Sequence, residues 1–488
     1  MPTPATLPDS LKAALGADGL AVIVKRDCPT CVLIEPVLKE LANGGRLTVL
    51  TQDDPSFPSL PGVVDDTDLA LSWQLDIETV PTLIRIKDGK EAARAFGWHR
   101  GEWEDVSGVK GLGAKLPAER PGCGSMTVDP DIADELAIRF GGVEFKSRPV
   151  EIGTQEDEHE ACFERDWTDG LPVVPPTRVR VHRMLKGTKR DPKEVLGMMP
   201  PDYQPCTVEK VAINAVMAGC KPEYMPVLLA AIEAVLEDAF CLHGVIATTM
   251  YVGPIIIVNG PVRRALDMNS GGNVLGQGNR ANSTIGRALQ LTIRNVGGGK
   301  PGGIDRATLG SPSKLGFCFA EDEEGSAWEP LGEERGIPEG KSSVTLFCGY
   351  GMTGVVDDKS RTPESLVRSF AAQVRAIHHH KNFPGPDMVV VISPEHMRTL
   401  REAGWTKARF KEELRLHSTI AADSILAGAE GIAVGPPEKL RGKMLTKVRE
   451  GGIQVVHAGG QAGMFSAILP GWTGGLANSH FVTKVVGE

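Results

Sequence analysis

The chain has 488 residues, of which 41% are hydrophobic and 24% are charged, and it carries a formal net charge of −9. This composition is typical of globular proteins, and the length exceeds what one ordinary core needs, so two or three domains are expected. The negative charge argues against a nucleic-acid or anionic-membrane partner, and an aromatic content of 5% argues against stacking on bases. We expect the partners to be a small-molecule substrate and a thiol reductant system. The composition is compatible with an oligomer as well as with a monomer.

The N-terminal sequence and the number of cysteines indicate the cellular compartment in which the protein is expected. Residues 1–5 contain no basic segment followed by an apolar one, so no signal peptide is expected. The most apolar segment, 252–258, is too short to span a bilayer and contains Pro254. Nine cysteines do not make a disulfide scaffold in a chain of this size, and an odd number leaves at least one unpaired. These features favour the reducing cytoplasm, with one dithiol used for chemistry.

The clearest chemical motif is Cys28-Pro29-Thr30-Cys31, which follows an apolar segment at 20–25 and precedes a helical pattern at 32–41. The sequence predicts a buried strand, a turn that carries two thiols, and a helix. Unpaired N–H groups and the dipole at a helix N-terminus favour a thiolate and lower the pKa of the first cysteine. A zinc site is the alternative, but no second Cys or His pair lies at zinc-ligand spacing, so a redox dithiol is favoured.

Further elements extend this unit to about residue 112. Strands are predicted at 46–50 and 83–86, and a short helix at 69–75. Asp88-Gly89 lies between two alternating apolar segments, which predicts a hairpin that returns through Phe96.

The Cys-x-x-Cys that opens a helix and the Val80-Pro81-Thr82 ahead of a hairpin resemble the thioredoxin superfamily, at the separation which that family shows. This resemblance implies that Cys28 is the attacking thiol, Cys31 the resolving thiol, and Pro81 a cis-proline that faces them and contacts the substrate. Asp27 and the Pro29-Thr30 pair differ from thioredoxin itself. Because the residues around the cysteines tune thiolate stability, the redox potential is not implied. A dithiol retained only as a scaffold is the alternative.

Glycine and proline punctuate residues 97–122, which predicts a loop-rich segment with a domain linker at 113–122. The chain then reaches Cys123, which lies between two glycines and ahead of a helix predicted to begin near Asp129. Such a cysteine has little steric protection and is a candidate second nucleophile. A small residue in a tight turn is the alternative.

Cys123-Gly124-Ser125-Met126 also resembles the Sec-Gly-Ser-Cys motif of the UGSC (seleno)protein family, with Cys in place of selenocysteine. Met126 stands where that family has its second thiol. A dithiol mechanism within this motif is therefore not implied.

The region after Cys123 alternates helical and strand patterns. Helices are predicted at 178–185, from Thr207 to Gly219, and at 226–236; strands are predicted at 243–249 and 253–261.

A glycine- and asparagine-rich segment, 268–287, then leads into a helix that Asn282 or Ser283 would cap. Glycines let the backbone approach a ligand, a helix N-terminus attracts anions, and Arg280 adds a charged fork for carboxylate or phosphate. The segment is neither a Walker loop nor a Rossmann fingerprint. The alternative is a loop whose asparagines bind its own backbone.

The segments 167–177, 211–224 and 278–286 together resemble an uncharacterised bacterial family that is found with or beside thioredoxin-like and UGSC-type units. The resemblance spans most of residues 160–330 and implies no activity. It singles out five pocket candidates: Cys220, Asn259, Asn279, Arg280 and Asn282.

The last part of the chain reads as alternating α/β, with strands at 344–347, 388–392 and 453–457 and helices at 365–377 and 406–417. The acidic run 321–324 predicts a solvated face. His457 at a strand end is a better candidate for chemistry than the cluster 378–380, because consecutive side chains point apart on a helix and ligand sites gather at strand ends.

The sequence therefore predicts an α/β protein with a thioredoxin-like domain at 1–112, a linker at 113–122, a Gly/Asn-rich substrate-binding domain at 123–335 and a C-terminal α/β subdomain at 336–488. The function that we expect is a thiol-dependent oxidoreductase or reductive lyase acting on a small anionic substrate. Cys123 or Cys220 would attack the substrate, and the Cys28–Cys31 dithiol would recycle that cysteine over a short tether. No cofactor beyond this dithiol and no metal is expected.

Two alternatives belong to other classes. One is a thiol-independent or metal-assisted hydratase or lyase that uses Cys206, Cys220, Cys241 and His243, although their spacing matches no zinc signature. The other is a non-enzymatic, redox-regulated binding module.

Overall fold

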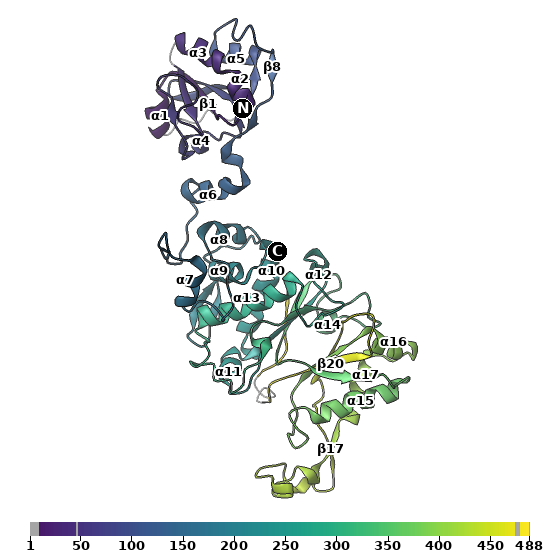
Figure 1. Ribbon diagram of the computed structural model, residues 1–488. Coiled ribbons are helices and arrows are strands. Elements are labelled where there is room, and N and C mark those ends of the chain that lie inside the picture. Colours follow the sequence, from purple (N-terminus) through teal and green to yellow (C-terminus); the bar gives the residue numbers. More distant parts are fainter. Residues whose placement is uncertain (1–8, 45–46, 474–478, 488) are drawn as a thin grey trace. The chain divides into compact units, whose positions relative to one another are not determined.

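The computed structural model describes residues 9–44, 47–473 and 479–487, and it is a mixed α/β protein (Figure 1). The chain divides into two compact units, Met1–Phe145 and Lys146–Glu488. We call them the first and the second unit and describe each by itself.

The first unit is built on a five-stranded sheet with the order β3-β2-β1-β5-β6. β1 is parallel to β2 and antiparallel to β5. Residues 21–24 of β1 are fully buried, as expected of a central strand that is covered on both faces. The strands of this sheet are β1 (Gly19–Val24), β2 (Leu47–Thr51), β3 (Val64–Asp65), β5 (Thr82–Lys87) and β6 (Lys90–Phe96).

Two short strand pairs lie outside this sheet. β4 (Thr79–Val80) pairs with β9 (Cys123–Gly124), and β7 (Trp98–His99) pairs with β8 (Glu119–Arg120). The helices of the unit are α1 (Asp9–Leu15), α2 (Pro29–Leu33), α3 (Glu35–Asn43), α4 (Ala70–Gln74), α5 (Arg100–Ser107) and α6 (Pro130–Phe140). The helix predicted at 32–41 is thus two helices, because Pro36 has no N–H to continue the first and is accepted in the first turn of the second.

The loop-rich segment predicted at 97–122 is wrong in part, because α5 lies inside it. Trp103 and Val106 of α5 are buried, and the helix packs against β5 and β6. Gly101 in the first turn and Gly108 at the C-cap give this segment a loop-like composition, although the two buried side chains anchor it as a helix. The observed division at 145/146 also differs from the linker predicted at 113–122, because β8 and β9 return the chain to the first unit.

The second unit contains two four-stranded sheets, ordered β13-β12-β14-β21 and β15-β20-β16-β19. The first sheet comprises β12 (Gly253–Asn259), β13 (Cys318–Ala320), β14 (Ser343–Gly349) and β21 (Val482–Val485); the second comprises β15 (Thr353–Val356), β16 (Met388–Ile392), β19 (Ile453–His457) and β20 (Phe465–Pro470). β12 is parallel to β13, and β16 is parallel to β19.

Alternating side chains place these sheets face to face. Ile255 and Ile257 of β12 share a core with Val389 and Val391 of β16. The intervening residues of β16 point the other way, into a second core with α15 (Pro363–Ala376), α16 (Pro394–Glu402) and α17 (Lys407–His417). On the far side of the first sheet, α10 (Met225–Leu236) packs against β14 and β21, and α13 (Arg280–Gly297) against β12 and β13. The layers therefore run helices, sheet, sheet, helices.

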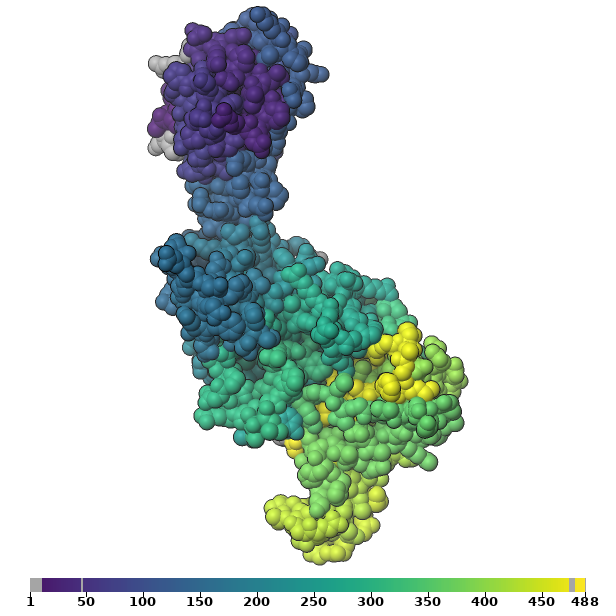
Figure 2. All heavy atoms as spheres, viewed as in Figure 1, coloured from purple at the N-terminus to yellow at the C-terminus, as the bar shows by residue number. Residues whose placement is uncertain are grey.

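The second unit contains further elements. They are α7 (Glu158–Glu164), α8 (Arg178–Leu185), α9 (Val208–Ala218), α11 (Leu242–Ala247), α12 (Val262–Ala265), α14 (Leu331–Glu334) and the strand pair β10 (Val195–Met199) and β11 (Gln204–Thr207). Of these, α9 is almost entirely buried and packs against α8 and α13. A further pair, β17 (Thr419–Ala421) and β18 (Met444–Thr446), carries residues 422–443 away from the rest of this unit (Figure 2).

Two predictions for this region differ from the structure. The strand predicted at 243–249 is wrong, because residues 242–247 form α11. The boundary predicted at 335/336 passes between β13 and β14, which belong to one sheet, so β12 and β14 pair across it.

Candidate functional site

The two thiols of the Cys-x-x-Cys motif lie where a strand gives way to a helix. Cys28 is the N-cap residue of α2, and its Sγ accepts a hydrogen bond from the Cys31 N–H at 3.4 Å. Cys28 is 1% exposed and Cys31 is fully buried. The N-cap position brings the Cys28 sulfur to the unpaired N–H groups of the first helical turn, which is the arrangement expected to stabilise a thiolate.

The two thiols have opposite pKa shifts. The side-chain hydrogen bond with Cys31 lowers the pKa of Cys28 to about 5, with help from Cys123 and from the N–H groups of Cys31 and Thr30, against the opposing effect of burial. Burial, followed by the neighbouring Cys28, raises the pKa of Cys31. At neutral pH, Cys28 is therefore a thiolate and Cys31 a thiol that donates to it.

A third thiol completes the site. Val80 is paired with Cys123 in the β4–β9 ladder, and the Sγ atoms of Cys28 and Cys123 lie 2.6 Å apart. The Cys28 Sγ is also 3.6 Å from the carbonyl oxygen of Val80, and the peptide bond between Val80 and Pro81 is cis. Burial, followed by the neighbouring Cys28, raises the pKa of Cys123, which is only partly buried. Cys28, Cys31 and Cys123 therefore form one thiol cluster within the first unit.

We call residues 121–127 the docked segment. A hydrogen bond from α2 holds one end of this segment against the dithiol. The Thr30 hydroxyl donates to the carbonyl oxygen of Pro121 at 2.7 Å. Gly122 allows this close approach, since a Cβ there would lie 2.8 Å from the carbonyl oxygen of Val80. The glycine beside Cys123 thus serves close packing against β4.

Gln52 holds the other end of the docked segment. Its side-chain amide donates to the Ser125 hydroxyl at 2.8 Å, and its Oε1 accepts from the Met126 N–H at 3.1 Å. The same amide donates to the Ser72 hydroxyl, which in turn donates to the carboxylate of Asp66. Because these groups are buried, each would lose a partner if the segment moved away.

Cys220, the other predicted nucleophile, lies in the second unit in a different environment. It follows the end of α9 and is 6% exposed. Burial raises the pKa of its thiol to about 12, although Thr284 and the nearby Arg280 act in the opposite direction. Because this thiol is buried as well as protonated at neutral pH, the structure gives no support to Cys220 as the attacking group.

The predicted substrate-binding residues at the start of α13 contact their own loop. The helix is capped by Asn279, three residues before the predicted cap, whose side chain accepts from the Asn282 N–H and donates to the carbonyl oxygen of Asp267. Asn282 is 3% exposed, and its amide binds both the N–H and the carbonyl oxygen of Asn269. These contacts match the alternative interpretation, in which the asparagines bind the loop backbone.

The two remaining residues of this group are exposed. Arg280 donates from Nε to the carbonyl oxygen of Gly219, and Ser283 lies in the first turn of α13. The arginine that sequence reasoning missed is Arg287, which forms a bidentate pair with Asp169 and joins α13 to the segment 167–177.

Asn259 belongs to a buried polar cluster at the end of β12. Its side-chain amide donates to Glu321 at 2.7 Å and to Glu323 at 2.9 Å, and Arg263 pairs with Glu323. Glu321 is 1% exposed, and burial raises its pKa. The solvated face predicted for 321–324 is therefore wrong at Glu321, because the parallel pairing of β12 and β13 brings this carboxylate beside Asn259.

Metal ligation finds no support among residues 9–44, 47–473 and 479–487, where no three His, Cys, Asp or Glu side chains gather as a ligand set. His457 is buried at the end of β19, where its Nδ1 contacts the carbonyl oxygen of Ile392 and its Nε2 lies 3.6 Å from the Asp322 carboxylate. Burial lowers the pKa of His457, so this contact is with a neutral imidazole.

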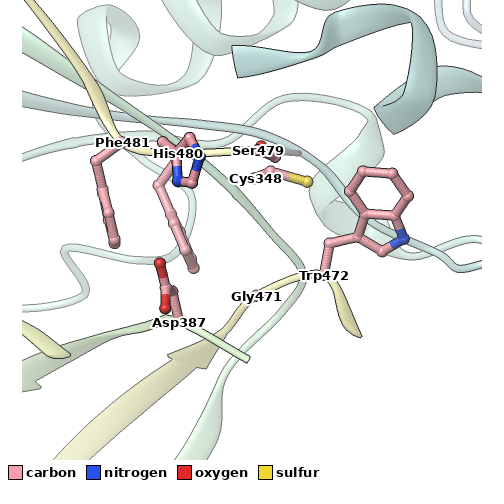
Figure 3. A pocket seen from close by; sticks show the side chains of 8 residues that line it. Cys348, Asp387, Gly471, Trp472, Ser479, His480 and Phe481 are labelled. Carbon is pink, nitrogen blue, oxygen red and sulfur yellow. The ribbon is translucent and has the colours of Figure 1, made fainter. Parts of the chain in front are cut away.

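A pocket in the second unit was not predicted from the sequence. Its empty volume is about 270 Å³, and Figure 3 shows the Cys348 sulfur beside Ser479 and Trp472. Burial raises the pKa of Cys348, and Asp387 on the opposite wall is paired with Arg449. The lining residues are Phe347, Cys348, Asp387, Gly471, Trp472, Ser479, His480 and Phe481.

Comparison of the chain with models of known protein families and with curated proteins gives no match. In the part of the chain that the structure describes, no helix combines the length and the apolar character needed to cross a bilayer.

Proposed function

We propose that the protein is a thiol-dependent oxidoreductase or reductive lyase in which Cys123 reacts with the substrate and the Cys28–Cys31 dithiol returns Cys123 to the thiol. The observation that carries this proposal is the 2.6 Å separation of the Cys28 and Cys123 sulfurs, set by the pairing of β4 with β9. A fused dithiol and its target thiol are thus presented to each other within one unit, where the effective concentration is high.

The chemistry has three steps. The Cys123 thiolate attacks an oxidised substrate, either at the sulfur of an S–S bond, which gives a mixed disulfide and expels a thiolate, or at the oxygen of an O–O bond, which gives a sulfenic acid and expels an alkoxide or hydroxide. The Cys28 thiolate then attacks the Cys123 sulfur, forms the Cys28–Cys123 disulfide, and expels the substrate thiolate or hydroxide. Cys31 loses its proton and attacks the Cys28 sulfur, which releases the Cys123 thiolate and leaves a Cys28–Cys31 disulfide for an external thiol to reduce.

The pKa values of Cys28 and Cys31 suit these roles, whereas Cys123, whose pKa is raised by burial and by Cys28, must lose its proton before it attacks. An attacking thiol must be deprotonated, and Cys28 with a pKa of about 5 is so at neutral pH. Cys31, whose pKa is raised by burial, holds its proton until Cys28 has given up its charge to a disulfide, and the loss of that neighbouring charge makes ionisation easier.

The resemblance to the thioredoxin superfamily is part of this proposal. It is supported by the mixed sheet, in which β1 and β2 are parallel and β5 and β6 antiparallel, by the dithiol at the start of α2, and by the cis peptide bond before Pro81. All nine cysteines are free thiols, which goes with the cytoplasmic location that we propose.

Trapping with Cys31→Ser tests this function. After exposure to one equivalent of hydrogen peroxide, the variant should accumulate a Cys28–Cys123 disulfide, identified by peptide mapping under non-reducing conditions. Cys220→Ser in the same background is the matched control and should not change the yield. A Cys31→Ser protein that instead traps another protein on Cys28, or forms no internal disulfide, would contradict the proposal.

A further inference from the structure

The three thiols of the cluster differ in how far solvent can reach them. Cys28 is 1% exposed and Cys31 is fully buried, whereas Cys123 is only partly buried. Thr30, the one hydroxyl side chain between the two cysteines, is 2% exposed. A dithiol that accepts electrons from outside needs a sulfur that an external thiolate can approach, and in this fold that sulfur belongs to Cys123.

The cover over the dithiol is the docked segment itself. β9 supplies the backbone partners of β4, Thr30 binds Pro121, and the Ser125 N–H donates to the carbonyl oxygen of Glu78. Gln52 adds two further hydrogen bonds at the far end. A protein that presented its own disulfide on a strand would have to displace all of these contacts, because the β4 edge already has a strand beside it.

We infer that electrons both enter and leave the Cys28–Cys31 dithiol through disulfide exchange at Cys123. The external reductant is then a low-molecular-weight thiol rather than a protein. The inference rests on the proposed function and names the reductant class for the same site. Substrate and reductant then use one sulfur in turn, which is the basis of a ping-pong cycle.

The reducing half of the cycle consists of three thiol–disulfide exchanges. The Cys123 thiolate attacks the Cys28 sulfur of the Cys28–Cys31 disulfide, and Cys31 leaves as a thiolate that takes up a proton. A small thiolate attacks the partly buried Cys123 sulfur of the resulting Cys28–Cys123 disulfide and expels the Cys28 thiolate. A second small thiolate then attacks the small-thiol sulfur of the mixed disulfide and expels the Cys123 thiolate, so that two small thiols become one small disulfide and the dithiol is reduced.

The test is the rate at which dithiothreitol reduces the Cys28–Cys31 disulfide in the full-length Cys123→Ser protein, followed by acid quenching and mass spectrometry. Serine keeps the size of the side chain and the backbone pairing of β9 but cannot exchange disulfides. We expect reduction at least about ten-fold slower than in the wild type. A rate within two-fold of the wild type would overturn the inference, even if Cys31→Ser still traps the Cys28–Cys123 disulfide and the proposed function stands.

Two further variants test whether the docked segment blocks access of a small thiol to Cys28. In the Cys123→Ser background, Gln52→Ala removes the hold on Ser125 and Met126, and Thr30→Val removes the hydrogen bond to Pro121. Each should restore rapid reduction by dithiothreitol, because direct access to Cys28 becomes possible. If both variants stay as slow as Cys123→Ser alone, the docked segment is not the barrier and the inference fails.

Discussion

The pKa of Cys28 should rise when its strongest hydrogen-bond donor is removed. Cys31 contributes the largest effect that holds this pKa at about 5. A hydrogen bond to a charged group is worth roughly 1.5–3 kcal/mol, and one pKa unit corresponds to about 1.36 kcal/mol, so Cys31→Ala should raise the pKa of Cys28 by about 1–2 units. Cys31→Ser keeps an O–H donor at the same place and should leave the pKa closer to that of the wild type.

The assay is an ultraviolet thiolate titration of the reduced full-length protein. Each variant is compared with its own Cys28→Ser derivative, so that the difference spectrum reports Cys28 and not the other cysteines. Equal pKa values in Cys31→Ala and in the wild type would refute the claim that the Cys31 thiol stabilises the Cys28 thiolate. A rise as large in Cys31→Ser as in Cys31→Ala would show that packing, rather than the donor, sets the value.

Three further predictions concern Gln52, Cys28 and Asn282. Gln52→Ala should raise the hydrogen-exchange rate of the Met126 amide about ten-fold, because a buried hydrogen bond worth ~1–3 kcal/mol is lost; an unchanged rate would contradict the role of Gln52. Because the folded pKa of Cys28, about 5, lies below its ordinary value of 9.0, the reduced wild type should gain thermal stability over Cys28→Ser as pH rises between these values, and lose this advantage as pH falls through about 5; a difference that does not vary with pH would oppose it. Asn282→Ala should lower the unfolding free energy of the second unit by about 1–3 kcal/mol, measured by denaturant titration, and leave thiol exchange in the first unit unchanged; loss of exchange would contradict the placement of the whole thiol cluster in the first unit.

Local patterns in the sequence predicted many of the elements. The strands at 388–392 and 453–457 and the helix at 178–185 have the predicted bounds, because each is an apolar run or an amphipathic repeat flanked by clear turn or cap residues. The hairpin at Asp88-Gly89 is confirmed for the same reason, since its turn type depends on two adjacent residues. These features need no information about distant parts of the chain.

The predictions that failed depend on distant partners. Residues 243–249 contain β-branched side chains that favour a strand, yet α11 forms there, with Gly244 packed close to Trp472. The acidic run was expected at the surface, but β12 lies beside β13 and provides Asn259 as a partner for Glu321. Tertiary contacts override local propensity at both places.

The candidate site also combines a motif that the local sequence predicts with a contact that only the fold determines. The dithiol was visible in four consecutive residues, and Cys123 was visible only as an accessible cysteine between glycines. Its contact with Cys28 joins residues 95 positions apart and depends on the pairing of β4 with β9, which no local pattern specifies. The sequence shows that Asn279 and Asn282 lie in a glycine-rich segment, but their hydrogen bonds to the loop backbone depend on the fold.

The order in which the disulfides form tests the central claim most directly. Reduced wild-type protein is mixed with one equivalent of hydrogen peroxide, quenched with acid at successive times, alkylated and mapped by mass spectrometry. The proposed relay predicts that a Cys28–Cys123 disulfide appears first and decays as the Cys28–Cys31 disulfide accumulates. Formation of the Cys28–Cys31 disulfide without that intermediate, and at the same rate in Cys123→Ser, would contradict it.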